Sequence, residues 1–313
     1  MGLSCEHLIG IEDLGVADIE LILETARSFQ EINQRPLKKV PTLRGRSVIT
    51  LFYEPSTRTR SSFELAAKRL SADSVNVSIS ASSVVKGESL IDTGWTLESM
   101  KPDVIVVRHP EAGAVHVLVR SCRSARFVNA GDGMHEHPTQ ALLDALTILD
   151  HKKRLAGLKV AIVGDIAHSR VARSNVLLLS RMQAQVTVCG PPTLIPMDFE
   201  RYGVRVEYNM PKALQGVDVV MMLRTQQERQ KEVFFPSAKE YFNLYGLNKH
   251  KMRAAAPDAI IMHPGPMNRG VEIDPEMADG EYSVILEQVT NGLAVRMAVL
   301  FLLMGAGKEE DEA

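Results

Sequence analysis

Residues 47–71 read SVITLFYEPSTRTRSSFELAAKRLS, and this stretch decides the fold class. It begins with the β-rich run Ser47–Tyr53, passes through a polar segment that starts at Glu54, and ends with helical periodicity over residues 62–71. A short apolar strand followed at once by a helix is the repeating unit of a parallel sheet covered by helices. The stretch therefore predicts an α/β fold.

The same pattern recurs along the chain. Further Val- and Ile-rich runs lie at Val104–Val107, Phe127–Val128, Val160–Val163, Val186–Cys189, Val219–Leu223 and Ala259–Met262. Helical periodicity is found over about Ala17–Phe29, Thr139–Leu149, Arg170–Met182 and Glu287–Met304. Continuous apolar strands that alternate with helices indicate parallel sheets buried on both faces.

The length predicts two domains, since 313 residues is about twice the usual domain of roughly 150. The charged segment 151–157 ends one α/β series just before the next begins. We therefore expect one domain at residues 1–150 and a second at 151–286, each a parallel sheet flanked by helices. The last helix, within 287–306, is expected to return to the first domain, so that helices join the two.

Composition excludes several classes of protein. The chain has 45% hydrophobic and 24% charged residues, which is typical of a globular protein. Its 36 Lys and Arg nearly balance 38 Asp and Glu, so no overall field favours nucleic acid or an anionic membrane. An anionic ligand must then be bound by a local cluster of cations.

The location is expected to be cytoplasmic. The three cysteines form no CxxC pair, which argues against a zinc ribbon or a disulfide framework. The first residues carry acids where a signal peptide carries bases. The longest apolar stretch, residues 292–306, contains Arg296 and is shorter than the roughly 20 residues that span a bilayer.

The polar segment after the first strand is the first candidate site. Ser56, Thr57 and Thr59 offer hydroxyls beside the unpaired N–H groups of a helix start, and Arg58 offers a planar fork that suits phosphate oxygens. The alternative is an ordinary Ser/Thr cap followed by surface arginines. The chain contains neither a Walker A motif nor GxGxxG, so the usual nucleotide loops are excluded.

Cations also follow other strands or begin the helix after them. Arg108 and Arg224 come directly after apolar runs, and Arg170 follows the turn that starts at Gly164. Arg108 alone is equally well explained as a side chain that extends into solvent, and the segment up to Arg170 as an ordinary strand-to-helix turn with polar surface residues. Four arginines at strand ends, with Arg58 included, would surround a multiply charged anion, because ligands of open α/β sheets bind at these ends.

The segment His135-Glu-His137-Pro-Thr-Gln140 carries two histidines before a predicted helix. No third ligand lies at a zinc-like spacing, so we expect no metal there. His137 is suited to donating a hydrogen bond to a carbonyl oxygen, or to a structural role at the start of the helix.

Two segments are ambiguous. Residues 80–89 are small and polar, as in a mobile lid or a plain surface connection. Residues 234–245 combine five aromatic residues with nearby lysines and an arginine, which suits single-stranded nucleic acid or a partly packed closing loop. Without a net positive charge, the packed loop is the better interpretation.

These motifs together resemble the aspartate/ornithine carbamoyltransferases. The resemblance covers nearly the whole chain and rests on Ser-Thr-Arg-Thr-Arg at 56–60, Lys-Gly-Glu at 86–88 and His-Pro-Thr-Gln at 137–140. Ornithine enzymes typically carry His-Cys-Leu-Pro where this chain has His263-Pro-Gly-Pro266. Arg224-Thr-Gln226 also resembles an aspartate-recognition segment, which favours the aspartate branch.

The resemblance implies transfer of the carbamoyl group of carbamoyl phosphate to the α-amine of L-aspartate in pyrimidine biosynthesis. The first domain would bind carbamoyl phosphate and the second aspartate. The implied site residues are Ser56, Thr57, Arg58, Thr59, Ser82, Lys86, Arg108, His137, Gln140, Arg170, Arg224, Gln226, Gly265 and Pro266. Of these, Arg58, Thr59, Lys86, Arg108 and His137 would be catalytic.

The resemblance further implies a homotrimer in which Ser82 and Lys86 serve the site of the neighbouring subunit. No serine–histidine–acid arrangement is needed, since the departing phosphate can itself accept the proton, and we expect neither a cofactor nor a metal. Two alternatives remain at this stage: a carbamoyltransferase for ornithine or another amino acid, and a non-catalytic anion-binding relative. Whether a regulatory chain or a dihydroorotase joins the trimer is not decided by the sequence.

Overall fold

The computed structural model describes residues 2–78, 87–225 and 237–305. The chain divides into two compact units. The first runs from the N-terminus to Leu143 and resumes at Thr290, and the second is Asp144–Val289. Helices α5 (Pro138–Lys152) and α11 (Ile285–Gly305) each begin in one unit and end in the other, so two helices join the units.

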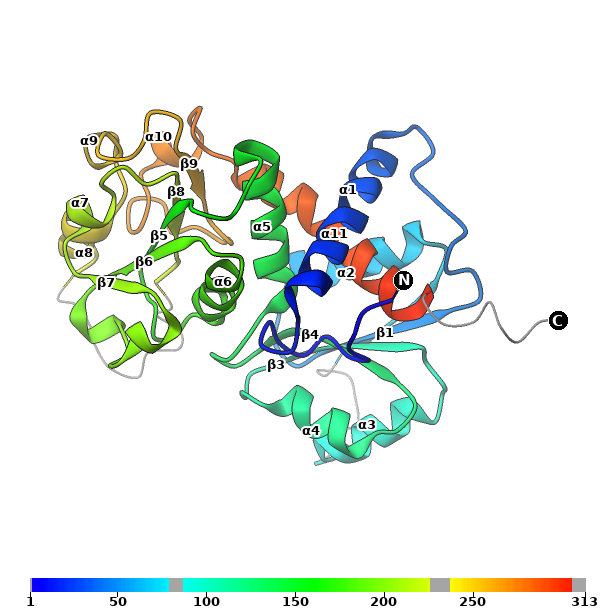
Figure 1. Ribbon diagram of the computed structural model, residues 1–313. Coiled ribbons are helices and arrows are strands. Elements are labelled where there is room, and N and C mark those ends of the chain that lie inside the picture. Colours follow the sequence, from blue (N-terminus) through cyan, green and yellow to red (C-terminus); the bar gives the residue numbers. More distant parts are fainter. Residues whose placement is uncertain (1, 79–86, 226–236, 306–313) are drawn as a thin grey trace. The chain divides into compact units, whose positions relative to one another are not determined.

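The first unit is built on a four-stranded sheet whose strand pairs are all parallel (Figure 1). The strand order is β2-β1-β3-β4. Besides parts of α5 and α11, its elements are α1 (Val16–Gln34), β1 (Ser47–Phe52), α2 (Thr57–Arg69), β2 (Asp73–Ser78), α3 (Leu90–Glu98), β3 (Val104–His109), α4 (Ala114–Ser121) and β4 (Arg126–Asp132).

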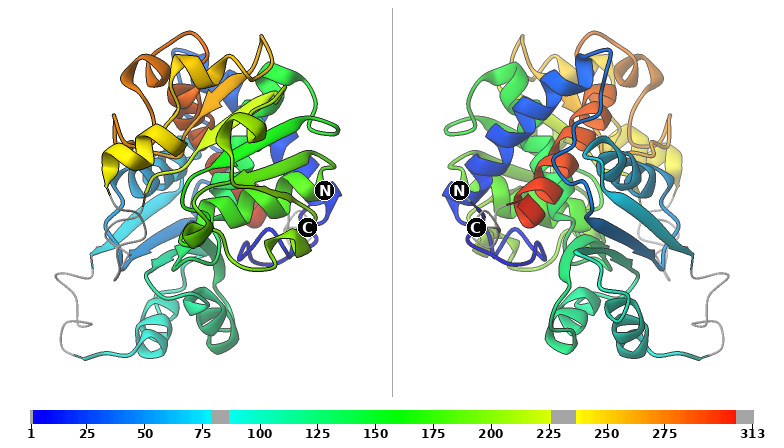
Figure 2. Two further views of the ribbon diagram at one scale, coloured as in Figure 1. Left: turned by 90° about the vertical axis from the view of Figure 1, so that its left-hand side faces the viewer. Right: turned by 90° about the vertical axis from the view of Figure 1, so that its right-hand side faces the viewer.

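Helices cover both faces of this sheet. Both views of Figure 2 place α3 and α4 on one face, where Leu97 and Leu118 pack against strand residues such as Ile105. On the other face α1 and α11 meet through the rings of Phe29 and Phe301, whose centroids are 5.8 Å apart. The apolar side chains of the strands are therefore enclosed between two helical layers.

The second unit contains a five-stranded parallel sheet of order β7-β6-β5-β8-β9. Its strands are β5 (Lys159–Val163), β6 (Gln185–Cys189), β7 (Arg205–Glu207), β8 (Val219–Met222) and β9 (Ile260–Met262). Its helices are α6 (Arg170–Arg181), the 3₁₀ turns η3 (Pro192–Leu194) and η4 (Phe199–Tyr202), α7 (Met210–Ala213), α8 (Ala238–Tyr245), α9 (Lys249–Met252) and α10 (Pro275–Ala278).

The main core of the second unit joins strands β5, β6, β8 and β9 to helices α7–α10. Tyr241 and Tyr245 of α8 are buried in this core with ring centroids 5.7 Å apart. The sequence predicted a partly packed loop over 234–245. The described part is instead a helix, and its aromatic residues stabilise the core. Phe234 and Phe235 lie outside the described residues.

Helix α11 is, in the described part of the chain, long and apolar enough to cross a membrane. However, 72% of its most apolar window is buried inside the structure, as in the core helix of a globular protein. Its hydrogen bonds within the first unit agree with this, since Arg296 Nη1 donates to Ser62 Oγ at 2.7 Å and Asn291 Oδ1 accepts from Gln30 at 2.7 Å.

The predicted fold class is confirmed: two α/β units with parallel sheets. Each apolar run named from the sequence coincides with a strand. The sequence missed β2 and β7, which lie at the outer edges of their sheets. Three of the residues at 73–77 of β2, among them Val75, are exposed, so this strand lacks the continuous apolar run of a buried one. Strand β7 reads Arg-Val-Glu and lacks such a run as well.

Gly164 directly follows β5, at a point where a side chain does not fit. Its φ is +138°, and an added Cβ would lie 2.8 Å from the carbonyl oxygen of Leu223, the residue after β8. Gly157 also has a positive φ, +74°, but a Cβ there would meet nothing within 4 Å.

We expect Gly164→Ala to destabilise the protein by at least about 3 kcal/mol, because strain and a backbone clash add. Gly157→Ala, the matched control, should cost only about 1–2 kcal/mol for the left-handed conformation. Urea unfolding followed by fluorescence and circular dichroism measures both. Equal destabilisation by the two substitutions would contradict the close approach at Gly164.

Candidate active site

Each sheet has a switch point, where the strand order reverses beside the first strand of its unit. In the first unit the chain goes from β1 to β2 on one side and then to β3 on the other. In the second unit the reversal lies between β5 and β8. Ligands of open parallel sheets bind beyond the carboxyl ends of the strands at such points. The loops that follow β1, β3, β5 and β8 are therefore the candidate site.

The loop after β1 leads into α2. Ser56 immediately precedes the helix, but within the described residues its side chain makes no capping hydrogen bond. Thr57 and Arg58 are exposed, and Thr59 is 7% exposed. The ordinary capping interpretation is thus not supported for Ser56. The first turn instead presents backbone N–H groups, hydroxyls and one guanidinium at the switch point, a combination suited to an anion.

Arg108, near the end of β3, is fixed by both neighbouring strands. Its Nε lies 3.1 Å from Glu54 Oε2, which follows β1, and its Nη1 donates to the carbonyl of Ala130 in β4 at 3.2 Å. The side chains of Arg108 and Glu54 are 14% and 19% exposed. The sequence left open whether Arg108 extends into solvent or points into a site. In the structure its side chain is held at the end of the sheet and does not extend freely into solvent.

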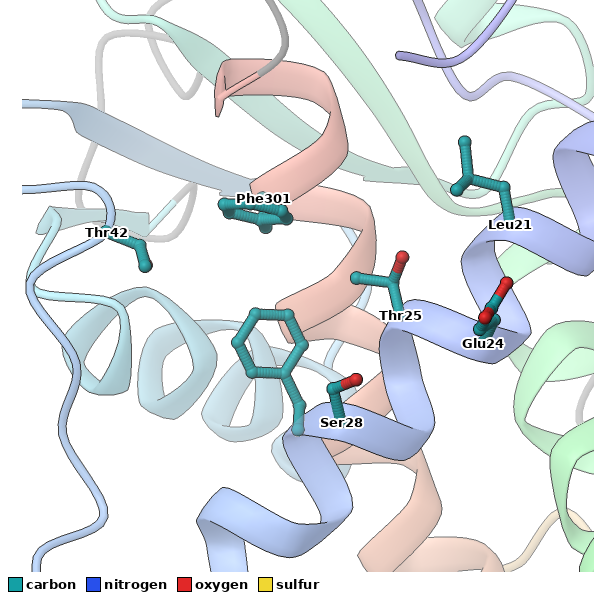
Figure 3. A pocket seen from close by; sticks show the side chains of 7 residues that line it. Leu21, Glu24, Thr25, Ser28, Thr42 and Phe301 are labelled. Carbon is teal, nitrogen blue, oxygen red and sulfur yellow. The ribbon is translucent and has the colours of Figure 1, made fainter. Parts of the chain in front are cut away.

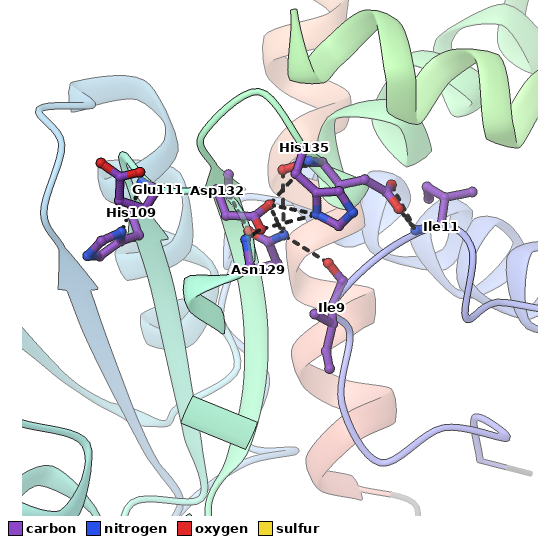
Figure 4. Close-up of polar contacts among 10 residues, drawn as sticks. Ile9, Ile11, His109, Glu111, Asn129, Asp132 and His135 are labelled. Carbon is purple, nitrogen blue, oxygen red and sulfur yellow. Dashed lines mark hydrogen bonds and ion pairs between the residues drawn. The ribbon is translucent and has the colours of Figure 1, made fainter. Parts of the chain in front are cut away.

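The loop after β4 is organised by Asp132, whose side chain is fully buried (Figure 4). The carboxylate accepts hydrogen bonds from Asn129 Nδ2 at 2.7 Å and from the N–H of Gly113 at 2.8 Å, and it lies 3.1 Å from His135 Nδ1. Burial by itself raises the pKa of Asp132, but these hydrogen bonds outweigh it and leave the pKa below its usual value. A buried carboxylate thus holds the turn that leads to α5.

Glu136, in the same loop, ties the turn to the N-terminal segment. Both of its carboxylate oxygens accept from the N–H of Ile11, at 3.0 and 2.9 Å (Figure 4). His137 follows directly, is 4% exposed, and precedes Pro138, the first residue of α5. Gln140 is 8% exposed in the first turn of that helix. His137 and Gln140 therefore occupy a buried loop-to-helix junction after β4.

In the second unit, the loop after β5 leads to Arg170, the first residue of α6. Asp165 is fully buried and accepts from the backbone N–H of His168 at 3.1 Å, and its carboxylate lies 2.8 Å from the His168 ring. Ser169 caps the helix, since its hydroxyl accepts from the N–H of Ala172. Arg170 is only 3% exposed. An arginine buried to this extent needs hydrogen-bonding or anionic partners.

The loops after β8 and β9 contact each other. Arg224 follows β8, and the next residue, Thr225, is 3.5 Å from Asn268 Nδ2. Asn268 also donates its N–H to Glu272 Oε1, which lies 3.3 Å from His263 Nε2. The described polar contacts therefore run from the loop after β8 to the loop that contains Gly265 and Pro266.

Sequence reasoning missed two supporting acids. Glu54 pairs with Arg108, and the fully buried Glu272 holds His263 and Asn268. The sequence offered one signal for Glu54: its negative charge comes just after β1, and the positive charge of Arg108 comes at the end of β3, which is the neighbouring strand. No sequence pattern indicated Glu272.

Ser82, Lys86 and Gln226 lie outside the described residues. The other predicted site residues fall into two groups, one at the carboxyl ends of β1, β3 and β4, the other at those of β5, β8 and β9.

A pocket elsewhere in the first unit, between α1 and α11, is lined by Leu21, Glu24, Thr25, Ser28, Phe29, Thr42 and Phe301 (Figure 3). It contains no cation and does not fit an anionic ligand.

Two family models match the chain. Residues 6–150 match the carbamoyl-P binding domain of aspartate/ornithine carbamoyltransferase, and residues 156–303 match the Asp/Orn binding domain. Among curated proteins, the aspartate carbamoyltransferase catalytic subunit of Syntrophotalea carbinolica is 57% identical over 313 residues, covering 100% of both chains. That of Syntrophus aciditrophicus is 58% identical over 96% of this chain and 98% of its own.

Solved structures agree. Aspartate transcarbamoylase from Trypanosoma cruzi, in complex with carbamoyl phosphate and aspartate, is 32% identical with a TM-score of 0.84 over 94% of this chain and 95% of its own. Ornithine carbamoyltransferase from Pyrococcus furiosus is 29% identical with a TM-score of 0.87, over 98% and 100%. The resemblance first seen in the motifs thus extends to the full length and to the fold, and the chain belongs to the aspartate/ornithine carbamoyltransferase family.

Proposed function

We propose that this protein transfers the carbamoyl group of carbamoyl phosphate to the α-amine of L-aspartate, giving N-carbamoyl-L-aspartate and phosphate for pyrimidine biosynthesis. The observation that carries the proposal is the placement of arginines at both switch points, in a chain more than half identical to aspartate carbamoyltransferase catalytic subunits. Both substrates are anions, and this arrangement offers each a separate set of cations and hydrogen-bond donors.

Residues 1–150, with the helix at 287–306, form the carbamoyl phosphate domain in this proposal. The first turn of α2 binds the phosphate through Ser56, Thr57, Arg58 and Thr59. Support comes from the exposed Arg58 and from the N–H groups of a helix start, which favour a phosphate. The match of residues 6–150 to a carbamoyl-P binding domain agrees.

Around the carbamoyl group, Thr59, Arg108 and His137 donate hydrogen bonds to the carbonyl oxygen, and Gln140 binds the carbamoyl nitrogen. These residues belong to the loops after three adjacent strands, β1, β3 and β4. Glu54 and Ala130 hold the guanidinium of Arg108 in one orientation, so little reorganisation is needed when charge develops on the oxygen.

Residues 151–286 form the aspartate domain. Arg170, Arg224 and Gln226 bind the two carboxylates, beside Gly265 and Pro266 of the loop after β9. Buried and half-buried arginines after neighbouring strands suit a dicarboxylate, because a guanidinium binds a carboxylate through two parallel hydrogen bonds. A positively charged ornithine side chain would meet arginines here, so aspartate is the better substrate.

The reaction needs no covalent enzyme intermediate. The neutral amine attacks the carbamoyl carbon, the carbonyl oxygen becomes negative, and the bond from carbon to the phosphate oxygen then breaks. The departing phosphate takes the bonding electron pair and accepts the proton released by the nitrogen. The protein contributes position and charge stabilisation, and loss of one donor to such an oxyanion typically costs about 2.7–4 kcal/mol.

In the cell, we propose a cytoplasmic homotrimer whose subunits share active sites. Ser82 and Lys86 of one subunit would serve the pocket of the next, as the Lys-Gly-Glu motif at 86–88 suggests. A regulatory chain or a dihydroorotase bound to this trimer is compatible with the proposal.

We expect the purified protein to form carbamoyl aspartate from aspartate, and to form little citrulline from ornithine. Arg224→Ala should reduce kcat/KM for aspartate by about 30-fold or more, since an unpaired substrate carboxylate costs about 2–5 kcal/mol. The exposed Arg205, which pairs with Glu207, provides the control: Arg205→Ala should leave the rate unchanged. Faster turnover of ornithine would refute the proposed substrate, and unchanged aspartate kinetics in Arg224→Ala would place the pocket elsewhere.

His137 is expected to donate to the oxyanion without acting as an obligatory base. His137→Asn keeps a donor and should retain more kcat than His137→Ala, which loses it. Steady-state kinetics across pH test this. If both variants were equally inactive and the wild-type rate followed a single imidazole, the account with phosphate as the proton acceptor would be wrong.

Shared active sites can be tested by mixing two inactive variants, Arg58→Ala and Lys86→Gln. In a cyclic trimer every hybrid holds one pocket with intact Arg58 beside one intact Lys86. Random equal mixing makes about three-quarters of the trimers hybrid, so activity should recover to roughly a quarter of the wild-type rate. No recovery, with hybrid formation verified by native mass spectrometry, would confine Lys86 to its own subunit.

A further inference from the structure

Three potential metal ligands lie together in the first unit. His116 belongs to α4, Asp132 ends β4, and His135 lies in the turn that follows. One ligand atom from each lies within 4.8 Å of the others. The sequence predicted no metal because no third ligand has a zinc-like spacing from His135 and His137. The fold brings in a ligand from a different element, which no spacing rule detects.

The carboxylate of Asp132 can accept one more hydrogen bond or bind one cation. Its carboxylate accepts from Asn129 Nδ2 and from the backbone N–H groups of Gly113 and Glu136, at 2.7, 2.8 and 3.2 Å. An ionised carboxylate offers about four lone-pair positions. The remaining position faces the ring of His135, whose Nδ1 is 3.3 and 3.1 Å from the two oxygens.

The separation of His135 from Asp132 fits two kinds of bond. At 3.1 Å, a proton on Nδ1 makes a hydrogen bond to Oδ2. The same distance is close to the edge of a zinc tetrahedron, because ligands about 2.0–2.1 Å from the metal are about 3.3 Å apart. A metal ion can therefore replace this proton after small movements of the side chains.

His116 completes the cluster from the neighbouring helix. Its ring lies edge-on to that of His135, with centroids 5.6 Å apart. Its Nδ1 is buried and, among the described residues, has no hydrogen-bond partner. A buried imidazole nitrogen without a partner is costly, and a metal ion would satisfy it.

We propose that His116, Asp132 and His135 bind one Zn²⁺ ion, with water as the fourth ligand. Two imidazoles and one carboxylate suit zinc better than Mg²⁺ or Ca²⁺, which prefer oxygen ligands throughout. The ion fastens α4 to the turn at residues 133–137. It takes no part in the carbamoyl transfer itself, and instead stabilises the loop that carries His137.

The experiment measures metal binding directly on the full chain, freed of metal with a chelator and free of any histidine tag. Zn²⁺ titration by calorimetry and thermal unfolding with and without Zn²⁺ are compared for the wild type, His116→Gln and His135→Gln. His250→Gln removes an exposed histidine of the second unit and is the matched control. Co²⁺ absorption then reports the ligands, because tetrahedral sites absorb strongly and thiolate ligands add charge-transfer bands.

We expect one equivalent of Zn²⁺ per chain in the wild type and the control, with an increase in melting temperature of at least about 4 °C at saturation. Both ligand variants should lose the binding and the increase, and Co²⁺ should give a tetrahedral spectrum without thiolate bands. The readout does not depend on activity, so failure of this site leaves the proposed reaction untouched.

Substoichiometric Zn²⁺ binding by the wild type would overturn the proposal, as would full binding by either folded ligand variant. If a variant does not fold, the other variant decides. The wild-type Co²⁺ spectrum is decisive by itself, since octahedral or thiolate coordination places the ion elsewhere.

Discussion

The parallel register of β1 against β3 is the constraint on which the first half of the site depends. Phe52 is the register partner of Arg108, so Glu54, just after β1, lies beside Arg108 near the end of β3. A slip of one residue would turn Arg108 to the opposite face of the sheet. The second sheet repeats the arrangement, because Val163 of β5 is the partner of Met222 and Arg224 follows two residues later.

Buried carboxylates hold the loops that follow these strands in one conformation. Asp132, Glu136 and Asp165 are each at most 1% exposed, and each accepts hydrogen bonds from backbone N–H groups in or beside a candidate site loop. Such groups are expensive to bury, and a loop built on them has few alternative conformations of similar free energy. Charge stabilisation of the kind proposed for the reaction requires donors that do not move as charge develops.

The sequence predicted the central strands because a buried parallel strand has a local apolar pattern. The runs at 104–107 and 160–163 are continuous and apolar since helices cover them on both sides. The edge strands β2 and β7 were missed for the opposite reason: one side of each faces solvent or loops, and polar residues are tolerated there. The contact of His116 with His135 and the support of His263 by Glu272 depend on tertiary packing alone, and no periodicity reports it.

The discontinuous first unit has a consequence for synthesis of the chain. Its sheet is complete at Asp132, yet α11, which packs against Phe29 and pairs with Ser62 and Gln30, leaves the ribosome only after the second unit. The second unit lies wholly between the two sequence segments of the first unit. Its own sheet can therefore form while the first unit still lacks the packing of α11 against its core. The order of emergence thus makes the N-terminal part the later one to reach its native packing. Its apolar surface must be shielded meanwhile, either by transient collapse or by a chaperone.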